Sequence, residues 1–78
     1  MPNVKVYSTK TCHFCHALKE FLKEHNIAFQ EIDVTYDEAL QQEMINKSGQ
    51  MGVPVTDIDG KIVVGFDQEK ISQLLNIK

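Results

Sequence analysis

The chain begins with two hydrophobic patterns in succession. Residues 4–7 alternate between valine and other side chains, which predicts a short strand that runs into the polar residues 8–11. The apolar residues after that stretch recur with the spacing of a helix that buries one face: Phe14, Ala17, Leu18, Phe21 and Leu22. The sequence therefore predicts a strand followed by an amphipathic helix.

A second strand and a second helix follow. Asn26 can end the first helix in a left-handed conformation, and residues 27–34 are rich in the branched and aromatic side chains of a strand. Thr35 and Glu38 have the spacing of a capping box, which predicts a helix that ends at residues 48–49, a Ser-Gly pair. Its apolar stripe consists of Leu40, Met44 and Ile45.

The last third of the chain predicts a hairpin and a final helix. Residues 53–58 and 61–64 read as strands joined by Asp59-Gly60, a pair that supplies the positive φ angles of a tight type I′ turn. Asp67 can cap the final helix. The apolar face of that helix consists of Ile71, Leu74 and Leu75.

The order of these elements defines an architecture. A strand, helix, strand, helix, two strands and a helix predict an α/β domain over residues 1–78, with a four-stranded mixed sheet and three helices on its two faces. Ligands of open α/β sheets gather at the carboxyl ends of strands. The end of the first strand leads directly to Cys12.

Composition narrows the class of protein. With 42% hydrophobic residues and a net charge of −3, the chain can form a small core and has no polycationic character for binding nucleic acid. No apolar run approaches the roughly 18 residues of a membrane span. Residues 1–5 lack the basic and apolar regions of a signal peptide, so we expect a cytoplasmic protein that does not enter membranes.

Both cysteines fall in the tetrapeptide 12–15. A disulfide between them would close a very short loop and stabilise the fold weakly, so the pair indicates redox chemistry or metal binding. At the start of a helix, Cys12 faces free N–H groups that favour its thiolate, which makes it the attacking nucleophile. Cys15 is one turn away and can resolve a mixed disulfide formed at Cys12. His13 either adds positive charge beside the thiolate or is a solvent-facing side chain.

The chain resembles the glutaredoxin family, most closely its short glutaredoxin-like redoxins. The resemblance rests on four motifs in the order and spacing of that family: Cys12 to Cys15, Ser48-Gly49, Val53-Pro54 and Gly65-Phe66-Asp67. It implies a thioredoxin-like fold and a thiol-disulfide oxidoreductase that reduces protein or glutathione mixed disulfides. Nothing in the sequence requires more than a monomer. It also implies that glutathione is the reductant or co-substrate and that no cofactor is bound permanently.

The resemblance also implies roles for single residues. Pro54 should be a cis proline facing the cysteines, with the backbone of Val53 offered to a bound peptide or to glutathione. Phe14 stands where the family has an aromatic residue beside the nucleophile, although core packing would also explain it. Phe66 and Asp67 match the helix start that receives the γ-glutamyl carboxylate of glutathione, although Asp67 could serve only as a helix cap.

Several positions depart from the family pattern. They are His13 for a proline, Gly52 for a threonine, Thr9 for a lysine, Gln50 for a basic residue, and Val64 and Gln68 within a Gly-Gly-x-Asp-Asp stretch. These departures weaken contacts that glutaredoxins make with glutathione. Gly65-Phe66 also resembles the redoxins that serve ribonucleotide reductase and are recharged by thioredoxin reductase, which is an alternative function.

Two further alternatives arise from the cysteine motif. Residues 12–16 match the Cys-x-x-Cys-His motif of c-type haem attachment, with Met51 as a conceivable distal ligand, but haem attachment would require export and a helical surrounding. The cysteines with His13 or His16 could also bind zinc or share an iron-sulfur cluster across a dimer. A closed zinc site needs four ligands and no second cluster follows, so we expect no metal site.

Overall fold

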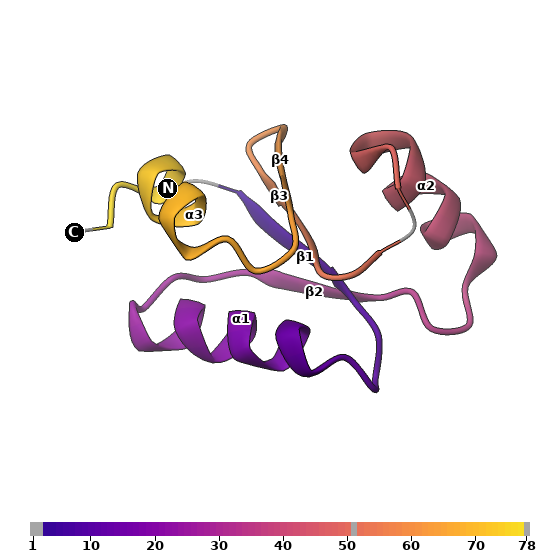
Figure 1. The fold of residues 1–78 in the computed structure, drawn as a ribbon, viewed down its shortest axis with the longest axis horizontal. Coiled ribbons are helices and arrows are strands. Elements are labelled where there is room, and N and C mark those ends of the chain that lie inside the picture. Colours follow the sequence, from indigo (N-terminus) through magenta and orange to yellow (C-terminus); the bar gives the residue numbers. More distant parts are fainter. Residues whose placement is uncertain (1–2, 51, 78) are drawn as a thin grey trace.

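The computed structural model describes residues 3–50 and 52–77. Its elements are β1 (Val4–Ser8), α1 (His13–Glu24), β2 (Gln30–Asp33), α2 (Glu38–Ser48), β3 (Val55–Ile58), β4 (Lys61–Val64) and α3 (Gln68–Leu75). The strands form one sheet in the order β2-β1-β3-β4 (Figure 1). β1 and β2 are parallel, and the other neighbours are antiparallel. The predicted thioredoxin-like mixed sheet with three helices is confirmed.

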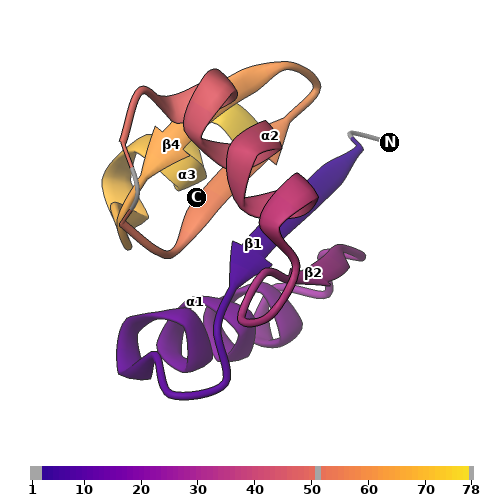
Figure 2. The same ribbon diagram turned by 90° about the vertical axis from the view of Figure 1, so that its right-hand side faces the viewer.

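The helices lie on both faces of the sheet. α1 and α3 cover one face, and α2 crosses the other, as the two perpendicular views show (Figures 1 and 2). The core beneath α1 and α3 is formed by Val4, Val6, Leu18, Leu22, Ile58, Val63 and Ile71. The core beneath α2 is formed by Tyr7, Val34, Met44 and Val55. The alternation along β1 thus fills both cores.

A cluster of hydrogen-bonded polar side chains connects α2 to the sheet. Lys47 of α2 donates hydrogen bonds to the Tyr7 hydroxyl and to Asp57, each 2.9 Å long, and Tyr7 donates to Glu43 at 2.9 Å. These two bonds of Lys47 raise its pKa. Burial alone would raise the pKa of Asp57, but the hydrogen bonds from Lys47 and from the Gly60 N–H lower it overall. Burial raises the pKa of Tyr7.

The predicted ends of the helices and the hairpin turn are mostly confirmed. Asn26 and Gly49 both have positive φ angles, of 57° and 76°. Asp59 and Gly60, with φ angles of 52° and 89°, form the turn between β3 and β4. The side chain of Asp67 accepts the N–H of Lys70 at 3.0 Å and caps α3.

Three predictions of local structure were wrong. Asp37, not Thr35, caps α2, because its side chain accepts the N–H of Leu40 at 3.1 Å. The second strand spans Gln30–Asp33 rather than 27–34, since the Ile27 N–H bonds back to Leu22 and completes the end of α1. The third strand spans Val55–Ile58 rather than 53–58.

Among the described residues, no helix has the length and hydropathy needed to cross a membrane.

Candidate active site

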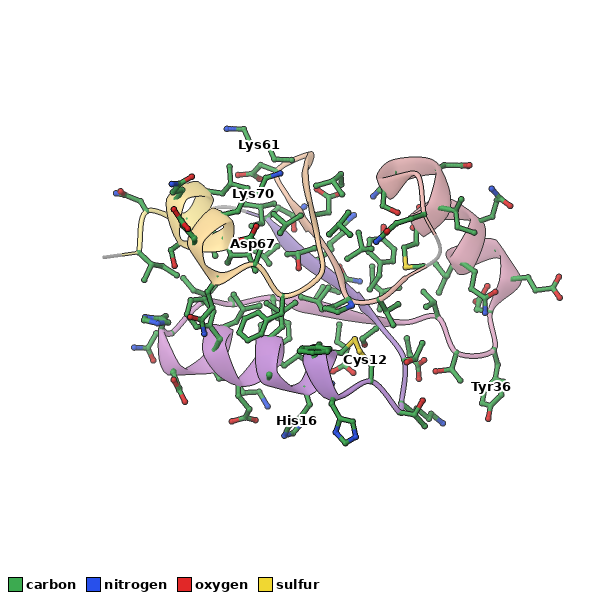
Figure 3. The ribbon with its side chains drawn as sticks, in the orientation of Figure 1. Cys12, His16, Tyr36, Lys61, Asp67 and Lys70 are labelled. Carbon is green, nitrogen blue, oxygen red and sulfur yellow. A yellow bond between two sulfur atoms is a disulfide. The ribbon has the colours of Figure 1, made fainter. Side chains whose placement is uncertain are left out.

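Cys12 occupies the N-cap of α1. Its backbone is extended, and its sulfur accepts the N–H of Cys15 across 3.1 Å. The two cysteines form a disulfide with their Cα atoms 5.2 Å apart, visible as the yellow bond at the start of α1 (Figure 3). Cys15 is 1% exposed, whereas Cys12 is only partly buried. Of the two sulfur atoms, that of Cys12 is therefore the one a substrate can reach.

The electrostatic setting of Cys12 favours its thiolate once the disulfide is reduced. The free N–H groups and the dipole at the start of α1 stabilise a negative charge on this sulfur. The first turn of α1 contains no acidic residue that would oppose it. The structure therefore distinguishes the two cysteines: the Cys12 sulfur is accessible at the start of α1, and the Cys15 sulfur is buried within its reach.

Val53 and Pro54 directly precede β3, at the end of the sheet from which the loop to Cys12 departs. The bond between them is cis, as the resemblance implied, and Pro54 is buried. Because Val55 pairs with Tyr7, Pro54 lies level with Ser8, the last residue of β1, and Val53 extends past it toward the loop that leads to Cys12. Pro54 accepts the N–H of Gly65 at 2.8 Å, which ties this segment to the end of β4.

Phe66 and Asp67 lie at the start of α3. The Phe66 ring packs edge-to-face on Phe21, with 5.8 Å between the ring centroids, and against the core. The Asp67 side chain is exposed and serves as the helix cap. Its contact with a γ-glutamyl carboxylate remains a prediction.

Phe14 lies two residues after Cys12 and is 67% exposed. The helical spacing placed Phe14 on the buried face of α1, and this was wrong, because the buried residues of that helix begin at Cys15. The aromatic ring is available to a partner beside the nucleophile. His13 and His16 are also exposed, and Figure 3 shows His16 pointing away from the sheet.

The loop before Cys12 is braced by the loop after β2. Thr35 accepts the backbone N–H of Lys10 at 3.2 Å and donates from its hydroxyl to Asp33. Asp33 also accepts the Thr35 N–H at 2.9 Å. The hydrogen bonds from Thr35 lower the pKa of Asp33. Thr35 thus holds a loop rather than the helix start that its spacing with Glu38 predicted.

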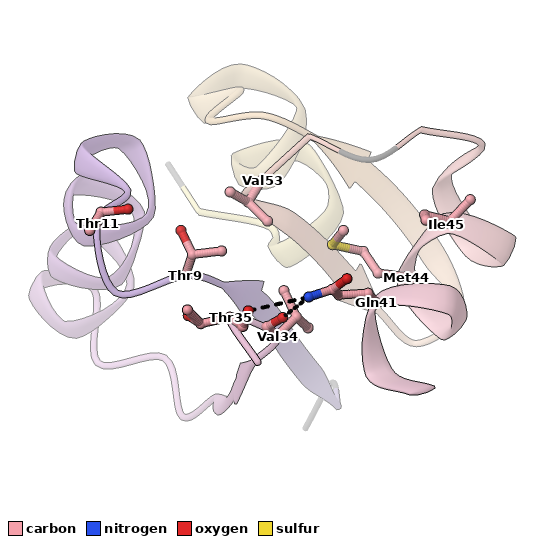
Figure 4. Close-up of a pocket in the computed structure, with 8 residues that line it drawn as sticks. All are labelled: Thr9, Thr11, Val34, Thr35, Gln41, Met44, Ile45 and Val53. Atoms are coloured by element: carbon pink, nitrogen blue, oxygen red, sulfur yellow. Dashed lines mark hydrogen bonds between the residues drawn. The ribbon is translucent and has the colours of Figure 1, made fainter. Parts of the chain in front are cut away.

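A cavity of about 300 Å³ opens beside the site (Figure 4). It is lined by Thr9, Thr11, Val34, Thr35, Gln41, Met44, Ile45 and Val53. Thr11 directly precedes Cys12, so the cavity reaches the residue next to Cys12, although Cys12 is not itself part of its lining. The sequence analysis did not single out Gln41. The available signal was its helical spacing from Met44 and Ile45, which places a polar residue on the apolar face of α2.

Neither of the metal-centred alternatives gains support. Over residues 3–50 and 52–77, no three His, Cys, Asp or Glu side chains form a group that could hold a metal ion. Met51, the distal ligand considered for a haem, lies outside the described residues.

Comparison with known proteins agrees with this geometry. The family model described as Glutaredoxin matches residues 4–63. An uncharacterized glutaredoxin-like 8.6 kDa protein of Clostridium pasteurianum is 46% identical over 72 residues, covering 92% of this chain and 96% of its own. Glutaredoxin 3 of Escherichia coli K12 is 37% identical over 67 residues, covering 86% and 81% of the two chains.

Two other matches are a second kind of relative and a solved structure. The glutaredoxin-like protein NrdH of Lactococcus lactis is 38% identical over 74 residues, covering 91% of this chain and 97% of its own. The crystal structure of a mutant of the thioredoxin-like protein BC3987 superimposes with a TM-score of 0.90 at 40% identity and full coverage of both chains.

Proposed function

Because the chain belongs to the glutaredoxin family and is a thiol-disulfide oxidoreductase, we propose that it reduces disulfides of proteins and glutathione mixed disulfides with both cysteines. The observation that carries this proposal is the asymmetry of the pair. Cys12 is accessible at the start of α1, and Cys15 is buried within its reach. This arrangement suits an attacking thiolate followed by an internal resolving thiol.

The reaction proceeds in two exchanges. The Cys12 thiolate attacks one sulfur of the substrate disulfide, forms a mixed disulfide, and expels the other substrate sulfur as a thiolate that takes up a proton. Cys15 then loses its proton and attacks the Cys12 sulfur, which releases the second substrate thiol. The substrate gains two electrons and two protons, and the protein ends with the Cys12–Cys15 disulfide seen in the structure.

The surroundings of Cys12 provide the substrate contacts. Val53 offers its backbone, since it lies before Val55, the first residue of β3 that pairs with β1. Phe14 presents an exposed ring beside the reacting sulfur. Phe66 and Asp67 at the start of α3 form the far end of the substrate site, where N–H groups favour a carboxylate.

A second candidate concerns the source of electrons. The chain would be a redoxin recharged by thioredoxin reductase that passes electrons to ribonucleotide reductase. The similarity to protein NrdH over nearly the whole chain supports this candidate. So does the site itself, because Thr9 stands where glutaredoxins have a lysine that binds glutathione.

Thiol counting on the oxidised protein distinguishes the reductants. One sample is incubated with glutathione, and the other with NADPH and thioredoxin reductase. Two new thiols in the glutathione sample support the glutaredoxin, and two thiols in the reductase sample alone support the second candidate. The Cys12→Ser, Cys15→Ser double variant, which cannot form the disulfide, gives the background thiol count of each sample. Release of two thiols by dithiothreitol but none in either sample would overturn both candidates.

A further inference from the structure

The cavity beside Cys12 is built from four separate parts of the chain. Thr9 and Thr11 come from the loop before the nucleophile, and Val53 comes from the segment before Pro54. The other contributors are Val34 and Thr35, which follow β2, and one face of α2. Figure 4 shows α2 across the cavity from the loop that carries Thr9 and Thr11. The cavity therefore lies between the substrate backbone position and a wall of α2.

The lining of this cavity is uncharged. Half of its eight residues are apolar: Val34, Met44, Ile45 and Val53. The amide of Gln41 donates to the carbonyl oxygens of Val34 at 2.6 Å and Thr35 at 3.3 Å, so its N–H groups are engaged with the backbone. The Thr35 hydroxyl is engaged with Lys10 and Asp33. These hydrogen bonds of Gln41 and Thr35 join parts of the cavity wall to one another.

The ammonium groups of Lys10 and Lys47 interact with side chains outside the cavity lining. The Lys10 ammonium lies over the ring of Tyr36, 5.7 Å from its centroid. The Lys47 ammonium is bound by Tyr7 and Asp57 at 2.9 Å each. A carboxylate that entered the cavity would lose water without gaining a cationic partner, which is unfavourable. An apolar side chain would be removed from water against Val34, Met44 and Ile45 at no such cost.

From this arrangement we propose that the cavity is a specificity subsite for an uncharged apolar side chain next to the reacting cysteine of a protein substrate. A substrate whose sulfur reaches Cys12 and whose backbone runs along Val53 brings a neighbouring side chain to the mouth of the cavity. The subsite selects protein segments with an aliphatic residue there over segments with an acidic one. The proposal rests on the disulfide-reductase function proposed above and specifies its substrates.

The test uses two peptides that differ in one residue. Each has a single cysteine joined to thionitrobenzoate, flanked by leucine in one peptide and by glutamate in the other. Attack by the Cys12 thiolate on the peptide sulfur releases the coloured thionitrobenzoate anion and links the peptide to Cys12, from which Cys15 then releases it as a thiol. Rates with reduced protein are divided by rates with dithiothreitol, which removes intrinsic differences between the peptides. We expect the leucine peptide to react about tenfold faster than the glutamate peptide.

Charge placed in the cavity should weaken this preference. Ile45→Lys from α2 and Thr9→Lys from the opposite loop each supply a cation, and either should lower the leucine-to-glutamate ratio at least fivefold. Gln42→Lys is the matched control, because Gln42 is exposed on the same helix and bonds to Asn46 at 2.9 Å. The control should keep the wild-type ratio. Because the two substitutions lie on different segments, the result does not depend on the correct folding of one variant alone.

The outcomes separate this proposal from the function on which it rests. A wild-type ratio near one, or a ratio unchanged in both Ile45→Lys and Thr9→Lys, overturns the subsite while leaving the reductase intact. Release of colour from neither peptide, or equal release by Cys12→Ser and wild type, overturns the reductase function itself. A ratio that falls in both variants and persists in Gln42→Lys supports the subsite.

Discussion

The backbone N–H of Cys15 points at the sulfur of Cys12 from 3.1 Å away. Because this donor belongs to the first turn of α1, we expect it to stay in place when the disulfide is reduced. It would then meet a thiolate, and hydrogen bonds to a charged acceptor are stronger than those to a neutral one. We therefore expect the backbone N–H of Cys15, the proposed resolving residue, to stabilise the thiolate of Cys12, the proposed nucleophile.

Alkylation of the reduced protein tests this activation. With iodoacetamide, we expect Cys12 to react first and its rate to rise with pH around a midpoint below about 8.5, the value of an ordinary cysteine. Peptide mapping by mass spectrometry identifies the modified residue. Preferential labelling of Cys15, or a midpoint at or above the ordinary value, would argue against activation by the helix start.

Replacement of Phe14 should separate binding from folding. Because this ring is 67% exposed, Phe14→Ala should change the free energy of unfolding by no more than about 0.5 kcal/mol, while it raises KM for protein disulfides. Leu18→Ala on the same helix is the matched control, since Leu18 is fully buried and its truncation should cost about 2–5 kcal/mol. Urea denaturation and steady-state kinetics provide the two measurements. Unchanged kinetics for Phe14→Ala would remove the ring from the substrate site.

Loss of the Lys47–Asp57 contact should destabilise the protein in a pH-dependent way. At pH 7, Asp57→Asn should cost about 2 kcal/mol of unfolding free energy, because it leaves the half-buried Lys47 without its carboxylate. The folded protein lowers the pKa of Asp57 below its usual 3.8, so this stabilisation is complete above that value and lost as pH falls through the lower folded pKa. Urea titrations should show the gap between wild type and variant closing in acid. An equal gap at neutral and strongly acidic pH would contradict this account.

The start of α2 distinguishes two kinds of cap. Since the Asp37 side chain accepts the N–H of Leu40, Asp37→Ala should cost about 1 kcal/mol. A capping box would instead have made Glu38 important, so Glu38→Ala is the comparison and should change stability by less than half as much. Thermal unfolding of both variants measures the difference. A larger loss of stability in Glu38→Ala than in Asp37→Ala would instead support a capping box formed by Thr35 and Glu38.

Signals confined to neighbouring residues predicted much of the fold. The hairpin turn at Asp59 and Gly60, the end of α2 at Gly49 and the cap at Asp67 depend on backbone angles or bonds within a few residues, and the structure has all three. The position of Cys12 at the start of a helix could also be predicted, because the helical spacing of apolar residues begins shortly after it. Val53-Pro54 was located only through resemblance to a family.

Features that depend on distant residues could not be predicted in this way. Thr35 has the local spacing of a helix cap, but its hydroxyl accepts the N–H of Lys10, 25 positions away. Phe14 follows the helical period, yet it lies in the first turn of α1 and is left exposed. The cavity is lined by four separated segments, so its uncharged wall around Gln41 becomes visible only when the chain is folded.

Trapping the reaction intermediate tests the central claim most directly. Reduced Cys15→Ser is mixed with a protein disulfide, and the products are separated without reductant and mapped by mass spectrometry. The account predicts a stable mixed disulfide through Cys12, which wild type does not accumulate because Cys15 releases the substrate. Cys12→Ser should form no such adduct and should lose disulfide-reducing activity. Full activity in Cys12→Ser, or no adduct at Cys12 in Cys15→Ser, would contradict the mechanism.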